Sequence, residues 1–516
     1  MNKNHLTQVV FLFLLTIGIL LGLSALKPTD ISFTTKRVDL LSSLRYEPAT
    51  EEIAEDDFAN EPASAIKEAD SATGIPDVEE TTVLVSDSIA RTTDDTTNSA
   101  TPTVSKPTRP QINAPRKAGD ITLIEDYTVE QSGLKNLESA LCNTTDTTRR
   151  TARIARIAFL GDSFTEADIM TQNIRLLLQD EYGGCGVGYM PMYSDCPGFR
   201  HSVSHVCEGW ETHSVISKPE YKNTSLSLQL HRPQDSTKTI TRFKGVNKLR
   251  HLDRWDVSKI GFITNETAVI SVKTDSGRRS YNVLPDDKAQ FITIAQTTQS
   301  LEIKCDRQSV AFWGAWLDCN KGITVDNISV RGYSGTTIQN IPSKRLKQLN
   351  EAIPYDMIIL QYGLNTMSKD VTDYTYFTKH LVNTVNHLRT AFPHTDILIM
   401  GISDRCQNID GTIQTMKAVY ALRQAQRDAA IEAGCHFWDC CEAMKTLGGM
   451  ATFVDNRWAN KDYTHINRAG GAHVAEAFIK AIKYAFEQKA APAAQTEAEA
   501  DTPTDTDTQT VTEINE

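Results

Sequence analysis

Three residues of types that act together in nucleophilic catalysis lie far apart in this 516-residue chain. Ser163 follows an apolar run at residues 154–161, and Asp462 and His465 stand three residues apart near the other end. A serine hydroxyl is a weak nucleophile unless a base accepts its proton, and a carboxylate that orients an imidazole provides such a base. Residues three apart on a helical turn share a face. The sequence therefore predicts a site in which Asp462 orients His465 and His465 activates Ser163.

Structural explanations compete with this interpretation. Ser163 precedes an amphipathic helical pattern, and serine is a common helix N-cap, so the position alone favours a cap over a nucleophile. Asp404, at the end of a predicted strand, is an alternative acid. We prefer Asp462 because its spacing gives His465 a direct partner.

Two turns provide candidate donors for an oxyanion. Gly335 lies in a glycine-bracketed turn at residues 330–337, where a glycine lets the backbone N–H come close to a ligand. Asn365 follows a second buried run, and losing an amide donor of this kind typically costs ~3 kcal/mol of barrier. Each turn alone is explained by ordinary turn chemistry, so the order of the motifs carries the argument.

The order Gly-Asp-Ser, Gly-x-x-Gly, Gly-x-Asn and Asp-x-x-His resembles the four blocks of the SGNH, or GDSL-type, hydrolase family. The resemblance implies that Ser163 is the nucleophile and that its N–H serves the oxyanion hole. It implies that Gly335 and Asn365 are the other two donors, and that Asp462 and His465 are the acid and the base. It implies no metal or organic cofactor.

A more specific resemblance rests on three features. These are an all-β insert after the first block, Thr-Glu-Ala-Asp at residues 165–168 after Gly-Asp-Ser, and the approach to the last block, in which Gly-Gly at residues 448–449 and Trp458 precede Asn-x-Asp-x-x-His. Together they resemble the peptidoglycan O-acetylesterase branch of the family, over roughly residues 120–488. This implies removal of O-acetyl groups from a cell-wall glycan and leaves acetylated xylan or another polysaccharide open. Phe164 and Thr366 depart from the family pattern, at positions outside the five site roles.

Apolar runs and helical patterns alternate through the hydrolase part of the chain, which predicts a three-layer, flavodoxin-like α/β fold with five parallel strands. The predicted strands lie at residues 154–161, 324–331, 356–361, 396–400 and 435–439, and the later helices at about 341–352, 373–391 and 413–433.

Residues 191–323 show short alternating runs without helical periodicity, which predicts an inserted all-β sandwich of the jelly-roll or carbohydrate-binding-module type. The insert either shields one side of the cleft or binds sugar. Its candidate stacking surfaces for sugar rings, which compete with the commoner role of core tryptophan, are Trp210, Trp255, Trp313 and Trp316.

The insert divides the predicted hydrolase into residues 116–190 and 324–490. Residues 1–27 contain an uncharged stretch long enough to span a bilayer, and we favour an anchor over a cleaved signal. The rest is then expected outside the cytoplasm, in the periplasm or at the cell surface. Residues 28–115 and 491–516 are predicted to be a disordered spacer and a disordered tail. Residues 48–110 and 491–516 carry net charges of −10 and −7 out of a total of −12, so the acidity belongs to these ends. Nothing suggests a nucleic-acid partner.

Ten cysteines in an extracytoplasmic chain permit disulfides. Cys196 with Cys207 and Cys305 with Cys319 are the candidate pairs within the insert. No Cys-x-x-Cys pair is present, so a zinc site is not expected.

Taken together, the residues predict a membrane-tethered serine esterase that deacetylates a polysaccharide, most of all peptidoglycan, through an acyl-enzyme. Two alternatives stay open: a non-catalytic glycan-binding protein on a hydrolase scaffold, and a lipase- or thioesterase-type SGNH hydrolase.

Overall fold

The computed structural model describes residues 116–145, 153–234, 239–369 and 371–500. The predicted membrane segment, the spacer at residues 28–115 and residues 501–516 of the predicted tail lie outside the described residues. Within the part of the chain that is described, no helix is both long and apolar enough to span a membrane.

The central sheet of the hydrolase part has six strands in the order β16-β4-β17-β18-β21-β3. Its strands are β4 (Ala155–Gly161), β16 (Ile323–Ser329), β17 (Met357–Gln361), β18 (Asp396–Met400), β21 (His436–Trp438) and β3 (Ile124–Asp126). The first five are parallel, and nearly every residue in them is buried, as expected for a sheet covered on both faces. The flavodoxin-like five-stranded prediction is confirmed. The sequence did not predict β3, which adds an antiparallel edge.

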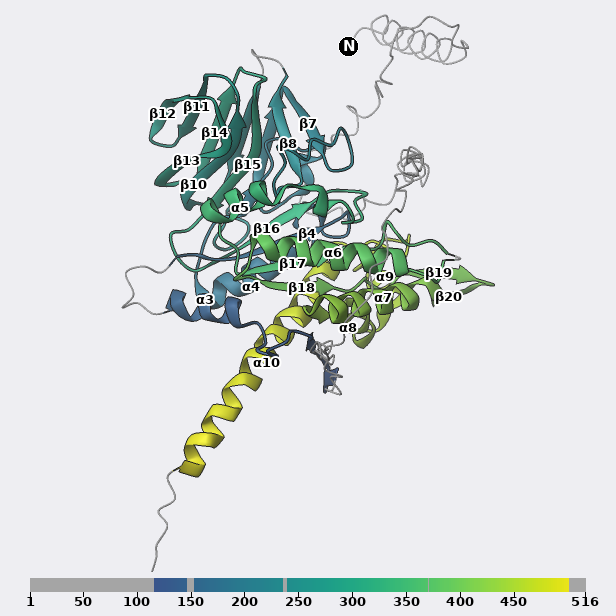
Figure 1. The fold of residues 1–516 in the computed structure, drawn as a ribbon. Coiled ribbons are helices and arrows are strands. Elements are labelled where there is room, and N and C mark those ends of the chain that lie inside the picture. Colours follow the sequence, from purple (N-terminus) through teal and green to yellow (C-terminus); the bar gives the residue numbers. More distant parts are fainter. Residues whose placement is uncertain (1–115, 146–152, 235–238, 370, 501–516) are drawn as a thin grey trace, which may run out of the picture. The chain divides into compact units, whose positions relative to one another are not determined.

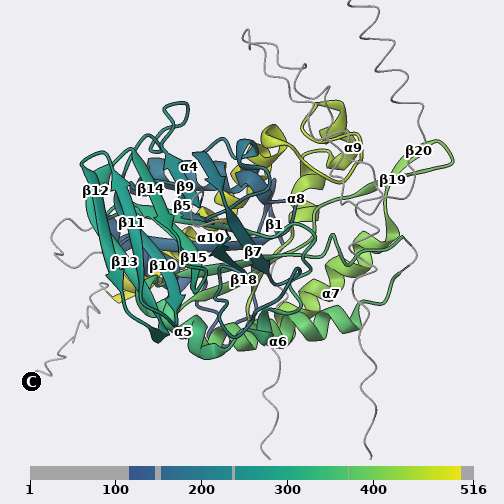
Figure 2. The same cartoon turned by 90° about the horizontal axis from the view of Figure 1, so that it is seen from above.

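Helices cover both faces of this sheet (Figure 1). One layer contains α3 (Lys135–Thr145), α4 (Thr171–Tyr182) and α10 (Arg468–Ala500), and the other contains α5 (Ser343–Ala352), α6 (Thr375–Ala391) and α7 (Lys417–Ala433). The backbone of α10 stays helical beyond residue 490, where the sequence places the start of the acidic tail. Shorter elements complete this part: β1 (Lys117–Ala118), β2 (Ile121–Thr122), α8 (Cys440–Thr446) and α9 (Gly449–Asp455). A hairpin of β19 (Cys406–Ile409) and β20 (Thr412–Thr415) projects beside α7 and α9 (Figure 2).

The insert consists of two antiparallel sheets, which confirms the prediction of an all-β domain. One sheet contains β5 (Gly188–Met190), β7 (Trp210–Ser214), β8 (Gln229–Pro233), β10 (Trp255–Thr264), β13 (Asp286–Thr298) and β15 (Val310–Asp318). The other contains β6 (Ser204–Glu208), β9 (Ile240–Lys244), β11 (Ala268–Thr274), β12 (Gly277–Val283) and β14 (Ser300–Cys305). Apolar side chains from both sheets form a core of their own, among them Phe243, Phe262, Ile270 and Phe312.

Buried ion pairs fix the insert to the hydrolase. Arg156 on β4 donates to Asp318 at the end of β15, with Nη2 2.6 Å from Oδ2, and to Asp326 on β16 at 3.1 Å. All three side chains are almost completely shielded from solvent. Because the buried guanidinium of Arg156 pairs with both carboxylates, β15, the last strand of the insert, is held in place beside β4 and β16.

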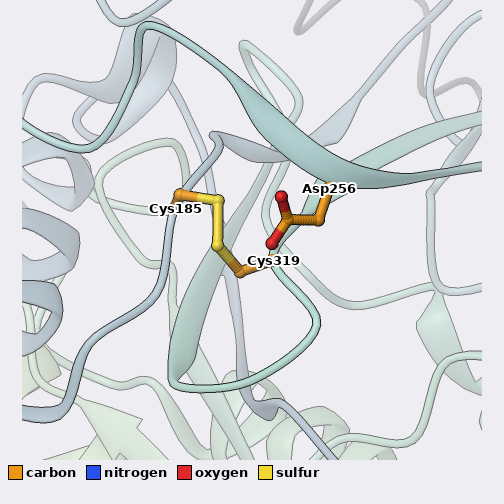
Figure 3. A group of neighbouring side chains, drawn as sticks. All are labelled: Cys185, Asp256 and Cys319. Carbon is orange, nitrogen blue, oxygen red and sulfur yellow. A yellow bond between two sulfur atoms is a disulfide. The ribbon is translucent and has the colours of Figure 1, made fainter. Parts of the chain in front are cut away.

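The structure contains a disulfide between Cys185 and Cys319, whose Cα atoms are 5.0 Å apart (Figure 3). The predicted pairs are wrong, because Cys196, Cys207 and Cys305 are free. The bond joins the loop that enters the insert to the residue that follows β15, where the chain returns to the hydrolase. The carboxylate of Asp256 lies beside it, but both sulfur atoms are already bonded to each other and are not thiolate ligands for a metal.

Candidate active site

The residues with predicted site roles lie at one edge of the central sheet. Ser163 follows β4, Gly335 lies in the loop after β16, and Asn365 follows β17. The carboxyl ends of parallel strands meet at the same edge, where open α/β sheets place their ligands. His465 comes from the segment that precedes α10 and reaches this edge, as its contact with Ser163 demonstrates.

Ser163, His465 and Asp462 form a continuous chain of hydrogen bonds. Ser163 Oγ lies 3.2 Å from His465 Nε2, and His465 Nδ1 lies 2.6 Å from Asp462 Oδ2. With the ring proton on Nδ1, the imidazole donates to the carboxylate, and Nε2 accepts from the serine hydroxyl. In this geometry the unprotonated Nε2 is within reach of the hydroxyl proton. The N-cap explanation for Ser163 does not apply, because α4 begins at Thr171 and its N-cap is Met170.

Asp462 is held as a carboxylate. Burial raises its pKa, but the hydrogen bond from the His465 ring and the backbone N–H groups of Thr464 and His465 outweigh that effect and lower the pKa below the usual value. The two backbone bonds go to Oδ1, at 2.9 and 3.0 Å, which leaves Oδ2 for the ring. One carboxylate therefore shapes the turn and orients the imidazole.

The loop that carries this pair is closed by backbone contacts. Asn460 N donates to His465 O at 2.8 Å, and Ala459 pairs with Ile466 in an isolated bridge. Between them Tyr463 adopts a φ of +54°, which is unusual for a residue with a side chain. The base of the β19–β20 hairpin fixes this residue, because Cys406 N donates to Tyr463 O at 3.0 Å. The loop therefore has little freedom to move His465 away from Ser163.

Of the two predicted oxyanion residues, Asn365 contacts Asp162, the residue before the serine, and Gly335 lies against Tyr362 at the end of β17. Asn365 Nδ2 donates to Asp162 Oδ2 at 3.0 Å and to the carbonyl of Tyr333 at 3.1 Å. Gly335 has a φ of +77°, and a Cβ there would lie only 2.4 Å from the ring of Tyr362. No other residue type fits that position, so this glycine allows its loop to lie against the end of β17.

Asp162 lies at this site, but the sequence analysis treated it only as part of the Gly-Asp-Ser motif and gave it no role of its own. It is fully buried, and burial raises its pKa to about 7, although the N–H of Phe164 and the charge of His465 act in the opposite direction. Its carboxylate accepts from Phe164 N at 2.9 Å and from Asn365. An acid directly before the serine, with no charged partner nearby in sequence, was the signal that could have identified it.

The shifted Asp162 has a consequence for stability. The pKa of Asp162 is about 7 in the folded chain, whereas its ordinary value is 3.8. Between these two pH values the folded state binds more protons than the unfolded state. The free energy of unfolding therefore falls as the pH rises from 3.8 to 7. Asp162→Asn removes this effect. We expect the stability of the variant relative to the wild type to improve from pH 4 to pH 8 by up to roughly 4 kcal/mol.

Urea unfolding of both proteins at pH 4 and pH 8 measures this difference, with the exposed residue of the β19–β20 turn, Asp410, changed to Asn as the control. The control should show no pH-dependent change. The free energy of unfolding of Asp162→Asn could instead differ from that of the wild type by the same amount at pH 4 and pH 8. That result would mean that Asp162 titrates like an exposed carboxyl.

Asp404, the alternative acid, accepts hydrogen bonds from residues other than His465. Its Oδ1 accepts from Thr415 Oγ1 at 2.8 Å and its Oδ2 accepts from Met450 N at 2.8 Å. It therefore ties the β19–β20 hairpin to α9, and the carboxylate that contacts His465 is that of Asp462.

The four tryptophans considered as sugar-stacking surfaces are all buried, at 0–6% exposure. Trp313 and Trp316 belong to the core shared with the hydrolase, and Trp210 and Trp255 to the core of the insert. This corrects the expectation of a stacking platform at these positions, because a ring inside the core has no face to offer a sugar.

Two comparisons with known proteins find similarity. Residues 293–472 match the model of the GDSL-like lipase/acylhydrolase family. The matched range contains Gly335, Asn365, Asp462 and His465, whereas Ser163 lies before it, across most of the insert. A search of curated protein sequences finds no match.

Among solved structures, one described as a peptidoglycan O-acetylesterase matches with a TM-score of 0.57 and 20% identity, over 71% of this chain and 99% of the other. An acetyl xylan esterase matches with a TM-score of 0.24 and 16% identity, over 31% of this chain and 81% of the other. A carbohydrate esterase family 2 enzyme with a carbohydrate-binding domain, from Myceliophthora fergusii, matches with a TM-score of 0.23 and 12% identity, over 48% and 94%. Of these three matches, the first has a TM-score that indicates a shared fold, and this fold extends over nearly the whole of the other chain.

Proposed function

We propose that this chain, whose residues 293–472 match the GDSL-like lipase/acylhydrolase family model and whose fold is shared with a solved peptidoglycan O-acetylesterase, is a carboxylic ester hydrolase that removes O-acetyl groups from a polysaccharide. The observation that carries the proposal is the hydrogen-bonded series Ser163, His465 and Asp462 at the carboxyl edge of the sheet. It provides a nucleophile, its base and the group that orients the base.

In the proposed reaction, Ser163 Oγ attacks the acetyl carbonyl while His465 Nε2 takes the hydroxyl proton. The negative charge on the carbonyl oxygen is met by the N–H groups of Ser163 and Gly335 and by the Asn365 amide, which gives up one of its two present acceptors. The imidazolium then protonates the sugar oxygen as the ester C–O bond breaks. A water molecule, deprotonated by His465, attacks the acetyl-enzyme and releases acetate.

Peptidoglycan is the first substrate to test, because the match to the peptidoglycan O-acetylesterase structure extends over 71% of this chain and 99% of that chain. Acetylated xylan is the second, since an acetyl ester on a sugar hydroxyl is the same chemical group in both polymers. The reaction needs only the acetyl group and enough room for the sugar that bears it.

We place the reaction outside the cytoplasm, in the periplasm or at the cell surface. Two observations support this location. The uncharged stretch at residues 6–26 has the length of an anchor or a signal segment, of which we favour the anchor. The Cys185–Cys319 disulfide is of the kind that persists in oxidising compartments.

The proposal is tested by measuring acetate release from O-acetylated peptidoglycan and from acetylated xylan side by side, together with ester substrates of increasing acyl length. We expect release from at least one acetylated glycan and a sharp fall in rate beyond two or three acyl carbons. Preference for long acyl chains would favour a lipase-type hydrolase instead. Glycan binding without any ester hydrolysis would favour the binding-protein alternative.

A further inference from the structure

A cavity of about 460 Å³ lies where the insert meets α5, and none of the candidate active-site residues lines it. Its walls include Lys222 and Asn223 from the connection between β7 and β8, Ser309 just before β15, and Arg345 in the first turn of α5. It is a separate place on the molecule, built jointly by the insert and the hydrolase.

Arg345 brings a buried positive charge to this cavity. The residue is only 6% exposed. Its guanidinium donates to Lys222 O at 2.9 Å, to Gln348 Oε1 at 3.0 Å, to Asn223 Oδ1 at 3.4 Å and to Asp287 O. All of these acceptors are neutral, and within the described parts of the chain Arg345 forms no ion pair. The charge of the Asp287 carboxylate acts on Arg345, but that carboxylate pairs with Lys344. A buried guanidinium without an ion-pair partner is costly, so an anion from outside would be bound favourably.

Other charged residues of the cavity are already neutralised. Arg232 pairs with Glu220 at 2.7 Å, and Asp287 pairs with Lys344 at 2.6 Å. The charges of Arg232 and Asp287 are therefore compensated by their partners. The net charge of the cavity lining depends on the other charged residues.

The remaining charges favour an anion. Lys222 is exposed and has no ion pair among the residues that the structure describes, and Asp286 is exposed and accepts a bond from a backbone N–H. With Arg345 this gives two positive charges against one negative charge. The hydroxyl of Ser309 is shielded from solvent and has no hydrogen-bond partner in the described structure, so it can serve a ligand as well.

The rest of the lining suits a sugar. Asn265 supplies an amide group for hydroxyls, whereas the amide of Asn223 is already bonded to Glu220 and Arg345. Ile263 and Ala311 supply an apolar wall for the C–H face of a ring. We propose that this cavity binds a carboxylate-bearing sugar unit of a polysaccharide, with the carboxylate on Arg345. The proposal depends on the proposed function only in taking a glycan as the ligand.

Two pairs of oligosaccharides without O-acetyl groups test this by calorimetry on the full-length protein. The first pair is the disaccharide of N-acetylglucosamine and N-acetylmuramic acid, whose lactyl group carries a free carboxylate, and neutral N,N′-diacetylchitobiose. The second is a xylo-oligosaccharide with and without a glucuronic acid branch. We expect at least tenfold tighter binding of the acidic member of one pair, as for a charge-assisted hydrogen bond. The pair that responds identifies the source of the carboxylate.

Two variants locate the preference. Arg345→Gln should abolish it, and Lys222→Glu should weaken it about threefold to tenfold with no risk to the fold, because the lysine is exposed. Arg389→Gln is the matched control, since Arg389 also donates to neutral backbone carbonyls but lies on α6, outside the cavity lining. Equal affinity for acidic and neutral sugars, or an unchanged preference in folded Lys222→Glu, would overturn the proposal. Neither result would contradict the proposed esterase activity, which is measured separately by acetate release.

Discussion

Ser163→Ala is expected to lower kcat for acetate release by between about 10⁴-fold and 10⁶-fold, the range found when a serine nucleophile is removed. The physical reason is the loss of Ser163 Oγ, the atom with which His465 Nε2 forms its hydrogen bond in the described part of the structure. No covalent acetyl-enzyme can then form. The activity that remains would come from the oxyanion donors acting on an attacking water molecule, so KM should change little.

The measurement compares kcat, KM and the thermal midpoint of unfolding for the wild type, Ser163→Ala and Ser343→Ala. Ser343 begins α5 and its hydroxyl pairs with Thr390, so its loss tests the removal of a hydroxyl outside the site. Both variants should fold like the wild type. If folded Ser163→Ala kept its rate within tenfold of the wild type, the serine mechanism would be wrong, and the acid–base pair would have to act on water directly.

The central sheet could be predicted because its parallel strands are buried on both faces and so are nearly continuous apolar runs. The edge strand β3 escaped because it is three residues long and pairs with β21 from more than 300 residues away. Its sequence, Ile-Glu-Asp, has no apolar period, and its pairing is decided by the register of β21. Local pattern carries no information about such a contact.

The tryptophans and the disulfide were mispredicted for a related reason. β15 is buried along its whole length, so that Phe312 and Leu317 face the core of the insert while Trp313 and Trp316 face the hydrolase. An alternating strand normally leaves one face to solvent, and only the docking of the insert covers the second face. The disulfide likewise depends on the two ends of the insert returning to one place.

The candidate site divides along the same line. The order of the motifs was enough to propose Ser163, Asp462 and His465 as partners, since Ser163 follows β4 and the other two lie in the segment just ahead of α10. The role of Asp162 as an acceptor for Asn365, and the strained Tyr463 in the loop ahead of His465, could not be inferred. Both depend on contacts between segments that are separated by the insert or by several elements of the sheet.

Asp462→Asn is expected to lower kcat by about 10⁴-fold while leaving the fold intact. Its amide oxygen can replace Oδ1 as acceptor for the N–H groups of Thr464 and His465, so the turn is preserved. The amide nitrogen then faces His465 Nδ1 and donates to it, which forces the ring proton onto Nε2. In that tautomer Nε2 can no longer accept the proton of Ser163, and the rate should fall with KM unchanged.

Asp404→Asn separates this effect from a general loss of an acid near the site. Asp404 holds Thr415 and Met450, so its variant should lose thermal stability while each folded molecule keeps a kcat close to that of the wild type. Rates corrected for the folded fraction, measured from pH 6 to pH 9, distinguish the two. Should Asp404→Asn lose the rate and Asp462→Asn retain it, the acid would be assigned to the wrong residue. The expected order instead follows from the 2.6 Å contact between Asp462 and His465, because only the carboxylate that touches the imidazole can decide which of its nitrogens carries the proton.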